Sequence, residues 1–442
     1  MGAPAGQFAA NPIRHEKVGF TMERGILGIR SMEHYEAAVV GAGPAGLACA
    51  LGMARAGIKT ILFAGPHRPG GFKVDQRTAA LFGCSIDFLT NLGAFEYFQG
   101  ASAPIRGIRI IDDTGRLLRA PEVLFTAQDI GFKELGYNVP QHDLVEALRR
   151  HCKAYEEHLR LVETKGVVDL AHEDEVAVLK TGEGGTFSAK VIAAADGRNS
   201  KCAQMAGLGV KRQSLDQTAL ATTFSHQRDH HAISTEFHRH SGPCTVVPMP
   251  GRRSSLVWVE RTDVARRLCE MPLDKFAKTL ETRLQGLLGD VSSIGPRTMF
   301  PLVSQVATRM GQRRVALIGE AGHVIPPIGA QGLNLSLRDA GMLVDLVSDA
   351  KTFAEDPGGD KVLNAYHKAR WFDIHSRVNA VELLNRSLIS DFEPVQLMRT
   401  AGLHVLKSFG PLRRFVIREG LGPQTGLPRM MQKQRPSQQT CA

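Results

Sequence analysis

Residues 315–339 read VALIGEAGHVIPPIGAQGLNLSLRD. An apolar, strand-like run breaks at Gly319, passes through a loop with two prolines and two glycines, and enters a helix-patterned segment near Leu333. A strand, a glycine-rich bend and a new helix N-terminus let backbone N–H groups converge on an electron-rich ligand. Packing alone requires no such crowding of proline and glycine, so the stretch predicts a cofactor-binding loop.

A second glycine-rich bend, GAGPAG at residues 41–46, follows a short strand candidate and precedes a helix candidate. A further strand at residues 59–64 completes a βαβ unit. In such a unit Gly41 makes the tight turn, Gly43 lets the backbone approach a pyrophosphate, and Gly46 permits close packing of helix on strand. No acidic residue follows the second strand to accept a hydrogen bond from a ribose. The unit therefore predicts a dinucleotide site that lacks one usual contact.

The remaining chain alternates between helical and strand-like patterns. Residues 76–92 have helical spacing with Arg77 at their start, and a second helix begins at Gln141. Residues 205–265 are β-rich, and the chain after Asp339 is mainly helical. Other strands are expected at residues 108–111, 116–118, 123–125, 161–170, 175–180 and 187–195. The predicted fold class is α/β, with a Rossmann-like domain, an inserted β-sheet domain and a helical C-terminal region.

Composition restricts the class of protein. The 442 residues are 43% hydrophobic and 22% charged, which indicates a globular chain with room for two or three domains. No run reaches about 18 apolar residues, so we expect a soluble or peripheral protein. The seven cysteines include no CxxC pair, as is typical of a reducing compartment. The five histidines between residues 226 and 240 lack supporting ligand spacing, so we expect no metal.

The net charge of +10 is concentrated near the C-terminus. From Arg399 onward there are eight basic residues and one acidic residue, interleaved with apolar ones. This pattern is typical of a segment that lies on an anionic membrane surface or on a partner protein. A solvated helical tail with a core-facing stripe accounts for it equally well. No recognition motif accompanies the charge, so nucleic acid is not an expected partner.

Three stretches resemble, in order and spacing, the class A FAD-dependent aromatic monooxygenases: GAGPAG at 41–46, ADGRNS at 195–200 and GEAGHVIPPIGAQGLNLSLRD at 319–339. The sequence of residues 324–341, together with GYNVPQ at 136–141, is similar to the sequences of the ubiquinone-biosynthesis hydroxylases. The similarity covers residues 35–425. It implies FAD as cofactor, NAD(P)H as electron donor, O2 as co-substrate and a polyprenylated phenol as substrate, hydroxylated through a flavin C4a-hydroperoxide.

The resemblance also implies roles for residues at matching positions. The glycines of residues 41–46 hold the FAD pyrophosphate, Glu320 takes a ribityl hydroxyl, and the helix after the loop presents backbone N–H groups to the flavin pyrimidine. Asp196 and Gly197 match a motif shared between FAD and NAD(P)H. The implied cofactor-binding residues are Gly41, Gly43, Gly46, Arg77, Gln141, Asp196, Gly197, Gly319, Glu320, Gly332, Leu333 and Asn334. Arg77 and Gln141 are expected to bind FAD from helices.

No residue is assigned as catalytic. Pro326 and Pro327 are implied to stiffen the loop beneath the flavin. We interpret His323 as a structural hydrogen-bonding residue, with a catalytic base as the alternative. Glu320 stands where the family usually has aspartate, and Ala203 stands where an arginine often follows the ADG motif. These departures weaken the expectation of tight FAD and nicotinamide binding.

Together these features predict a domain organisation and a function. The expected parts are an N-terminal extension (1–34), a FAD-binding domain (35–204 and 290–350, with 101–130 on the substrate side), a β-rich substrate domain (205–289) and a helical C-terminal region (351–442). We expect a hydroxylase of ubiquinone biosynthesis, cytoplasmic and peripheral on the inner face of the membrane, with residues 399–435 contacting the membrane or other quinone-biosynthesis proteins. A hydroxylase of soluble aromatics and a catalytically weak flavin-binding accessory subunit stay open as alternatives.

Overall fold

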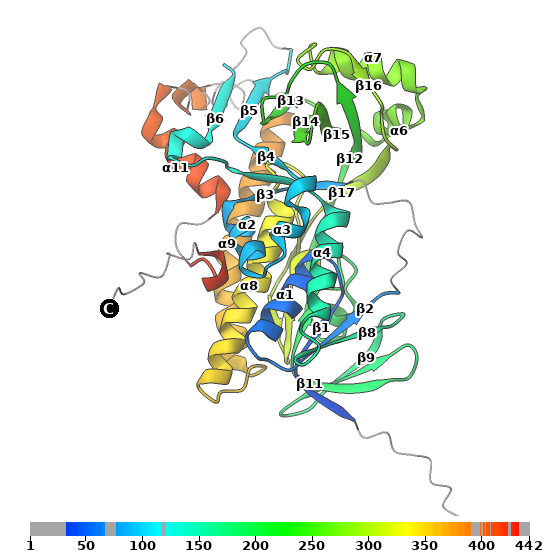
Figure 1. The fold of residues 1–442 in the computed structure, drawn as a ribbon, viewed down its shortest axis with the longest axis vertical. Helices are drawn as coiled ribbons and strands as arrows, with labels where there is room; N and C mark the ends of the chain where they lie inside the picture. The colour runs from blue at the N-terminus through cyan, green and yellow to red at the C-terminus, as the bar shows by residue number, and fades with distance from the viewer. Residues whose placement is uncertain are drawn as a thin grey trace, which may run out of the picture. The chain divides into compact units, whose positions relative to one another are not determined.

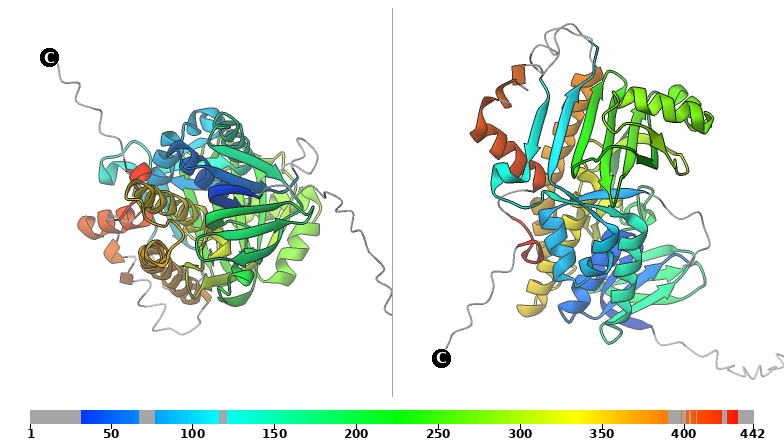
Figure 2. Two further views of the ribbon diagram at one scale, coloured as in Figure 1. Left: turned by 90° about the horizontal axis from the view of Figure 1, so that it is seen from below. Right: turned by 45° about the horizontal axis from the view of Figure 1, so that its top comes forward.

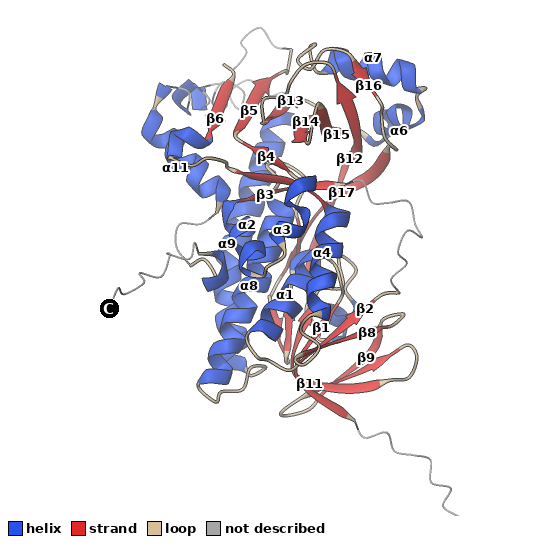
Figure 3. Cartoon of the chain, viewed as in Figure 1, coloured by secondary structure: helices blue, strands red, loops and turns tan. Residues whose placement is uncertain are grey.

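Two large β-sheets and a set of long helices form the computed structural model (Figures 1 and 3). The structure describes residues 32–66, 77–115, 121–389, 398, 401–402, 404–406, 408–422 and 426–432. By its internal contacts the chain divides into Met1–Met32 and Glu33–Ala442, and every element below belongs to the second unit. The expected strand at 116–118 lies outside the described residues, as does half of residues 394–409, in the region expected to be mainly helical.

The first sheet has a parallel core, in the order β19-β11-β1-β2-β8. Val40 pairs with Ala194, which pairs with Leu317, so β1, β11 and β19 end side by side. Parallel strands place their carboxyl ends at one edge, and each of these three strands leads into one of the glycine-containing stretches. The strands are β1 (Glu33–Val40), β2 (Thr60–Ala64), β8 (Leu159–Glu163), β9 (Val167–His172), β10 (Ala177–Thr181), β11 (Thr186–Ala194), β18 (Gly311–Gln312) and β19 (Val315–Leu317).

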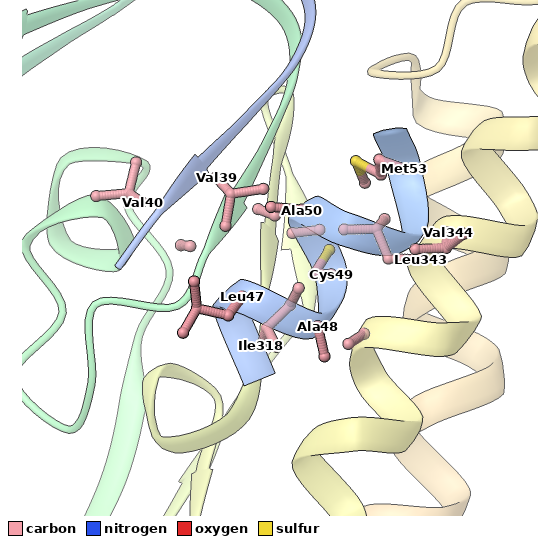
Figure 4. Packing of buried hydrophobic residues seen from close by; sticks show 14 of the residues in the cluster. Val39, Val40, Leu47, Ala48, Cys49, Ala50, Met53, Ile318, Leu343 and Val344 are labelled. Carbon is pink, nitrogen blue, oxygen red and sulfur yellow. The ribbon is translucent and has the colours of Figure 1, made fainter. Parts of the chain in front are cut away.

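Helix α1 (Pro44–Arg55) packs between this sheet and α8 (Gln331–Thr352). Figure 4 shows Met53 of α1 on the side that faces Leu343 and Val344 of α8, and Leu47 on the side of the sheet, near Ile318. A Cβ on Gly52 would lie 2.9 Å from Val344 Cγ2, so glycine permits the close approach of the two helices. Each fully buried large apolar side chain in this core contributes roughly 1.5–3 kcal/mol.

The second sheet has the order β20-β17-β12-β15-β14-β13-β5-β6. Helices α6 (Thr262–Glu270) and α7 (Leu273–Arg283) cover one face, where Leu220, Trp258 and Phe276 are buried together. Figure 2 shows these helices, in light green, beside the green strands. The strands are β5 (Gly107–Asp112), β6 (Val123–Thr126), β12 (Val210–His226), β13 (Ile233–Arg239), β14 (Gly242–Met249), β15 (Arg253–Glu260), β16 (Val291–Ser292), β17 (Thr298–Ala307) and β20 (His323–Val324).

A small sheet corrects one prediction. Residues 76–92 were expected to be helical, but Thr78–Phe82 is strand β3, and only Gly83–Asn91 is helix α2. The backbone of β3 pairs antiparallel with β7 (Gly136–Pro140), which also pairs with β4 (Ala103–Ile105). This pairing overrides the helical spacing. Arg77 therefore directly precedes a strand and is not carried by a helix.

The other helices complete the chain. Helix α9 (Asp360–Ile389) contacts strands of both large sheets, and α11 (Gly410–Leu421) packs Ile417 against residues of β6 and the turn after it. Among the described residues, no helix combines the length and hydropathy needed to cross a bilayer. The remaining helical elements are α3 (Phe95–Phe98), α4 (Gln141–Lys153), α5 (Lys201–Met205) and the 3-10 turns η1 (Gln99–Ala101), η2 (Ala127–Ile130), η3 (Gly319–Ala321) and η4 (Arg429–Met431).

Candidate active site

The three glycine-containing stretches meet at the carboxyl edge of the first sheet. Gly41 has a φ of +110°, and a Cβ there would lie 2.2 Å from the carbonyl oxygen of Ala195. A Cβ on Gly319 would lie 3.8 Å from the Cβ of Ala45. The three stretches, which are far apart in sequence, therefore lie together at one site in the structure.

Within the first stretch, the glycines differ in what surrounds them. A Cβ on Gly46 would lie 2.0 Å from the Gly41 carbonyl oxygen, so close packing requires glycine there. A Cβ on Gly43 would meet nothing within 4 Å, although Gly43 is the N-cap of α1. No side chain in the described part of the chain caps this helix start. An open backbone at an uncapped helix N-terminus fits the pyrophosphate of FAD.

The N-terminus of α8 is also uncapped. Its N-cap is Ala330, with a φ of +52°, and no described side chain caps the first turn. A Cβ on Gly332 would meet nothing within 4 Å. The backbone N–H groups of residues 332–334 lie in this first turn, where a helix leaves its N–H groups without intrahelical partners. They fit the carbonyl-rich pyrimidine end of a flavin, as the resemblance implies.

The side chain of Asn334 holds this turn in place. Its Oδ1 accepts hydrogen bonds from the Phe82 N–H at 2.9 Å and the Ser85 hydroxyl at 2.8 Å. Its Nδ2 donates to the carbonyl oxygens of Ala80 at 2.8 Å and Ala330 at 2.7 Å. Asn334 is fully buried in the first turn of α8. Its side-chain amide ties this turn to β3 and α2.

Beneath the loop lies a buried carboxylate. Asp339 accepts hydrogen bonds from the Gly319 N–H at 2.9 Å, His323 Nε2 at 2.6 Å and Arg370 Nε at 2.7 Å. Burial alone would raise the pKa of Asp339, but the charges of His323 and Arg370 outweigh burial and lower it. His323 is 2% exposed and directs Nε2 at this carboxylate, which favours its structural interpretation.

A second buried carboxylate extends the network to the C-terminal helices. Asp373 accepts from Arg338, Arg370 and Arg377 at 2.8–2.9 Å. Burial opposes ionisation of Asp373, but these three guanidinium groups together hold its pKa well below the ordinary value. Arg377 also donates to the side-chain oxygen of Gln331, the first residue of α8, at 3.0 Å. The loop is therefore held from α9 as well as from β3.

A cavity of about 770 Å³ opens between this site and the second sheet. Such a volume is typical of small-molecule sites. Five of the residues implied by the resemblance line one side of it: Arg77, Gln141, Glu320, Pro326 and Pro327. Residues of β12, β15 and β17 line the other side. The cavity thus joins the implied cofactor-binding residues to the β-rich insertion.

Arg77 and Gln141 lie next to each other at the cavity wall. Gln141 is the first residue of α4, and its N–H donates to the Arg77 carbonyl oxygen at 3.0 Å. The Arg77 guanidinium lies over the ring of Phe300, 5.1 Å from its centroid. The expectation that a helix carries each residue is therefore wrong for Arg77 and confirmed for Gln141.

Asp196 has a local structural role. Its carboxylate accepts from the Ser200 hydroxyl at 2.5 Å and the Cys202 N–H at 3.1 Å, at the start of α5. Neither Asp196 nor Gly197 is among the described residues that line the cavity. Gly197 has a φ of +82° and open space around it. The two residues therefore shape the bend after β11.

Arg198, Ser255 and Phe300 are among the cavity-lining residues that were not singled out from the sequence. Arg198 Nε lies 3.3 Å from Glu320 Oε2, and its place inside ADGRNS was a usable signal. For Ser255 and Phe300 no such signal existed, because period-2 alternation does not reveal which face of a strand meets the cofactor. Among the described residues, no group of three His, Cys, Asp or Glu side chains is placed to hold a metal ion.

Comparison with known proteins gives consistent similarities. Residues 34–378 match the family described as FAD binding domain. Ubiquinone hydroxylase UbiL of Rhodospirillum rubrum is 32% identical over 87% of this chain and 89% of its own. The 3-demethoxyubiquinol 3-hydroxylase of Escherichia coli is 27% identical over 88% of this chain and 98% of its own. The crystal structure of p-nitrophenol 4-monooxygenase PnpA from Pseudomonas putida DLL-E4 shares the fold, with a TM-score of 0.73, 18% identity, and coverage of 89% and 100%.

Proposed function

The chain belongs to the FAD-binding-domain family and has a ubiquinone hydroxylase among its relatives, and we propose that it hydroxylates the ring of a polyprenylated phenol in ubiquinone biosynthesis. It is an FAD-dependent monooxygenase, for which NAD(P)H is the typical electron donor and O2 the co-substrate. The expected fold, family and cofactor are confirmed. Two of the relatives are named ubiquinone hydroxylase and 3-demethoxyubiquinol 3-hydroxylase, which supports the same substrate class here.

One structural observation carries the proposal: two uncapped helix N-termini and a cavity of about 770 Å³ with mainly apolar walls open on the same edge of the first sheet. The start of α1 would hold the FAD pyrophosphate, and the start of α8 would hold the pyrimidine end of the flavin. Bound FAD supplies the exchange of electrons with NAD(P)H and the activation of O2. The chain itself must position the ring and exclude water.

The walls of the cavity suit an apolar, ring-containing substrate. Ala219, Ala221, Val257, Leu302 and Val303 line it from the second sheet, facing the loop that contains Pro326 and Pro327. Apolar walls exclude water and favour binding of an isoprenoid-substituted ring. Proline fixes φ, so the two prolines limit the motion of the loop against which the ring would lie.

Peripheral membrane contact through the C-terminal region is part of the proposal. On α11, Ile417 is buried, whereas Phe415 is 60% exposed and Phe409, just before the helix, is 56% exposed. Arg414 and Arg418 belong to the same helix. Exposed aromatic side chains beside arginine are suited to the interface of an anionic bilayer, where a polyprenylated substrate resides.

The function is tested by genetic complementation. Expression of this chain in cells that lack a ring hydroxylase of ubiquinone biosynthesis should restore ubiquinone and remove the accumulated precursor, and the identity of that precursor gives the ring position. Purified protein that stays colourless after incubation with FAD would contradict the proposal. Full activity on small phenols, with no restoration of ubiquinone, would favour the soluble-aromatic alternative. A chain that restores ubiquinone in a hydroxylase-deficient cell is no mere accessory subunit.

Membrane contact is tested by sedimentation with vesicles containing anionic phospholipid. Phe415→Ser should reduce the bound fraction, because it removes exposed apolar area from α11. Phe353→Ser is the matched control, since Phe353 is 71% exposed at the end of α8. Equal binding by the wild type and Phe415→Ser, or equal loss in both variants, would contradict the role of α11.

A further inference from the structure

Two neighbouring serines on β15 face opposite sides of the second sheet. Ser255 is 4% exposed and lines the large cavity. Ser254 is 1% exposed and pairs with His226, whose Nε2 lies 3.0 Å from the Ser254 hydroxyl. Successive side chains alternate across a strand, so only the Ser255 hydroxyl reaches the substrate side.

The Ser255 hydroxyl already accepts two hydrogen bonds. The Thr78 hydroxyl donates to Ser255 Oγ at 2.8 Å, and Asn138 Nδ2 donates to the same oxygen at 3.2 Å. A serine hydroxyl has two acceptor lone pairs and one proton to donate. Both lone pairs are therefore in use, and no residue in the described part of the chain accepts the Ser255 proton.

A backbone carbonyl fixes the direction of these bonds. Asn138 Nδ2 also donates to the Pro248 carbonyl oxygen at 2.8 Å. A carbonyl oxygen only accepts, so the amide nitrogen of Asn138 must face it, and the same nitrogen then faces Ser255. Asn138 is 2% exposed and sits in β7, which pairs on both sides with β3 and β4. The amide cannot rotate away without losing a buried hydrogen bond.

We propose that Ser255 donates a hydrogen bond to the oxygen on the aromatic ring of the phenol, and that Asn138 and Thr78 are positioning residues that keep its proton for this bond. The inference rests on the proposed ring hydroxylation and adds the residue that orients the ring. A ligand that lacks the oxygen leaves the buried Ser255 hydroxyl unpaired, so this donor favours a phenol over a ring without oxygen. Donation to the oxygen also stabilises the ionised, more electron-rich ring.

The test compares two probe ligands that differ by one oxygen. Calorimetry measures binding of 2-prenylphenol and of prenylbenzene to the FAD-loaded protein. Ser255→Ala should weaken binding of 2-prenylphenol about 10-fold and change that of prenylbenzene less than about 2-fold. Ser255→Thr, which retains a hydroxyl, should restore the preference for 2-prenylphenol over prenylbenzene. Ser254→Ala makes the same chemical change on the opposite face of the sheet and should bind both probes like the wild type.

The positioning role of Thr78 is tested with the same two probes. Thr78→Val removes one donor to Ser255 and should reduce the preference for 2-prenylphenol about 3-fold, whereas Thr78→Ser should restore it. Equal weakening of both probes in Ser255→Ala, no weakening of either, or the same loss in Ser254→Ala would overturn the inference while the hydroxylase function stands. A wild-type protein that binds FAD but neither probe would overturn the inference and the proposed substrate class together.

Discussion

Single buried polar side chains hold the cofactor loop in place. The amide of Asn334 uses all four of its hydrogen-bonding positions, and the Asp339 carboxylate accepts three hydrogen bonds without exposure to water. A buried hydrogen bond contributes modestly when made, but an unpaired partner left behind costs its full desolvation. Substitutions at these positions should therefore lower stability more than the small number of atoms removed would suggest.

Asn334→Ala tests this at one residue. It leaves three backbone groups and a serine hydroxyl without their Asn334 partner, so we expect the free energy of unfolding to fall by about 3 kcal/mol. Urea denaturation followed by circular dichroism measures the change. Asn364→Ala, at an exposed position of α9, should alter the free energy of unfolding by less than about 0.5 kcal/mol. Similar values for both variants would show that the amide does not hold the loop.

Asp373 gives a prediction of pH dependence. Its folded-state pKa lies below the unfolded-state value of about 3.9, so the carboxylate stabilises the fold above that pH and the contribution is lost as pH falls below it. Asp373→Asn should lower the free energy of unfolding by about 3 kcal/mol near neutral pH. The difference from the wild type should shrink by about 1.4 kcal/mol for each pH unit below about 3.9.

Urea titrations at neutral and acidic pH measure this difference. The control is Asp169→Asn, which removes an exposed ion pair with Lys180 on the antiparallel edge of the first sheet. It should leave stability nearly unchanged at every pH, because solvent screens exposed pairs. A difference between Asp373→Asn and the wild type that does not depend on pH would contradict the ionised state of Asp373.

Among the elements, the bend into α1 contains one glycine that we expect to matter for FAD binding and another that we expect to matter for folding. Gly43→Ala adds a methyl group where the fold leaves open space, at a φ of −73°, so stability should change by less than about 1 kcal/mol. The same methyl group would face the pyrophosphate, so FAD affinity should fall at least about 10-fold. Gly46→Ala should instead unfold the protein, because its Cβ would overlap the Gly41 carbonyl oxygen.

Fluorescence titration of the apoprotein with FAD, alongside thermal unfolding, checks both variants. Loss of stability in Gly43→Ala comparable to that in Gly46→Ala would mean that Gly43 serves the fold. Unchanged FAD affinity in Gly43→Ala would place the pyrophosphate elsewhere.

Much of this element-level arrangement was predictable from the sequence. The βαβ unit and the loop of residues 315–339 follow from local patterns, because glycine and proline restrict the backbone where they stand. Strand β3 did not follow, because its conformation depends on pairing with β7, some 60 residues away in sequence. The role of Ser255 was likewise hidden, since it depends on donors from β3 and β7 that only the folded chain brings together.

At the scale of the whole molecule, α9 connects the cofactor loop with the C-terminal helix. Arg377 donates to Gln331 at the start of α8 and to the Glu419 carbonyl oxygen of α11 at 3.1 Å. Gln331 Nε2 also donates to the Gly420 carbonyl oxygen at 3.2 Å. Docking of α11 and the position of the loop therefore depend on the same side chains.

Arg377→Met should weaken both together. It removes the donor shared by the loop and α11, so we expect FAD affinity to fall about 5-fold and cleavage of α11 by trypsin to accelerate. Lys361→Met, which removes an exposed cation near the start of the same helix, should change neither quantity. Faster cleavage with unchanged FAD affinity would show that α11 docks independently of the cofactor loop.

Transfer of one oxygen atom from O2 to the ring of a prenylated phenol is the reaction that we propose for this chain. Mass spectrometry of the product formed with FAD, NAD(P)H and isotopically heavy dioxygen measures this directly. We expect a hydroxylated product that carries one heavy oxygen atom, formed only when the phenol is present. A product that takes its oxygen from water, or NAD(P)H oxidation without hydroxylated product, would show that the chain is not a ring hydroxylase.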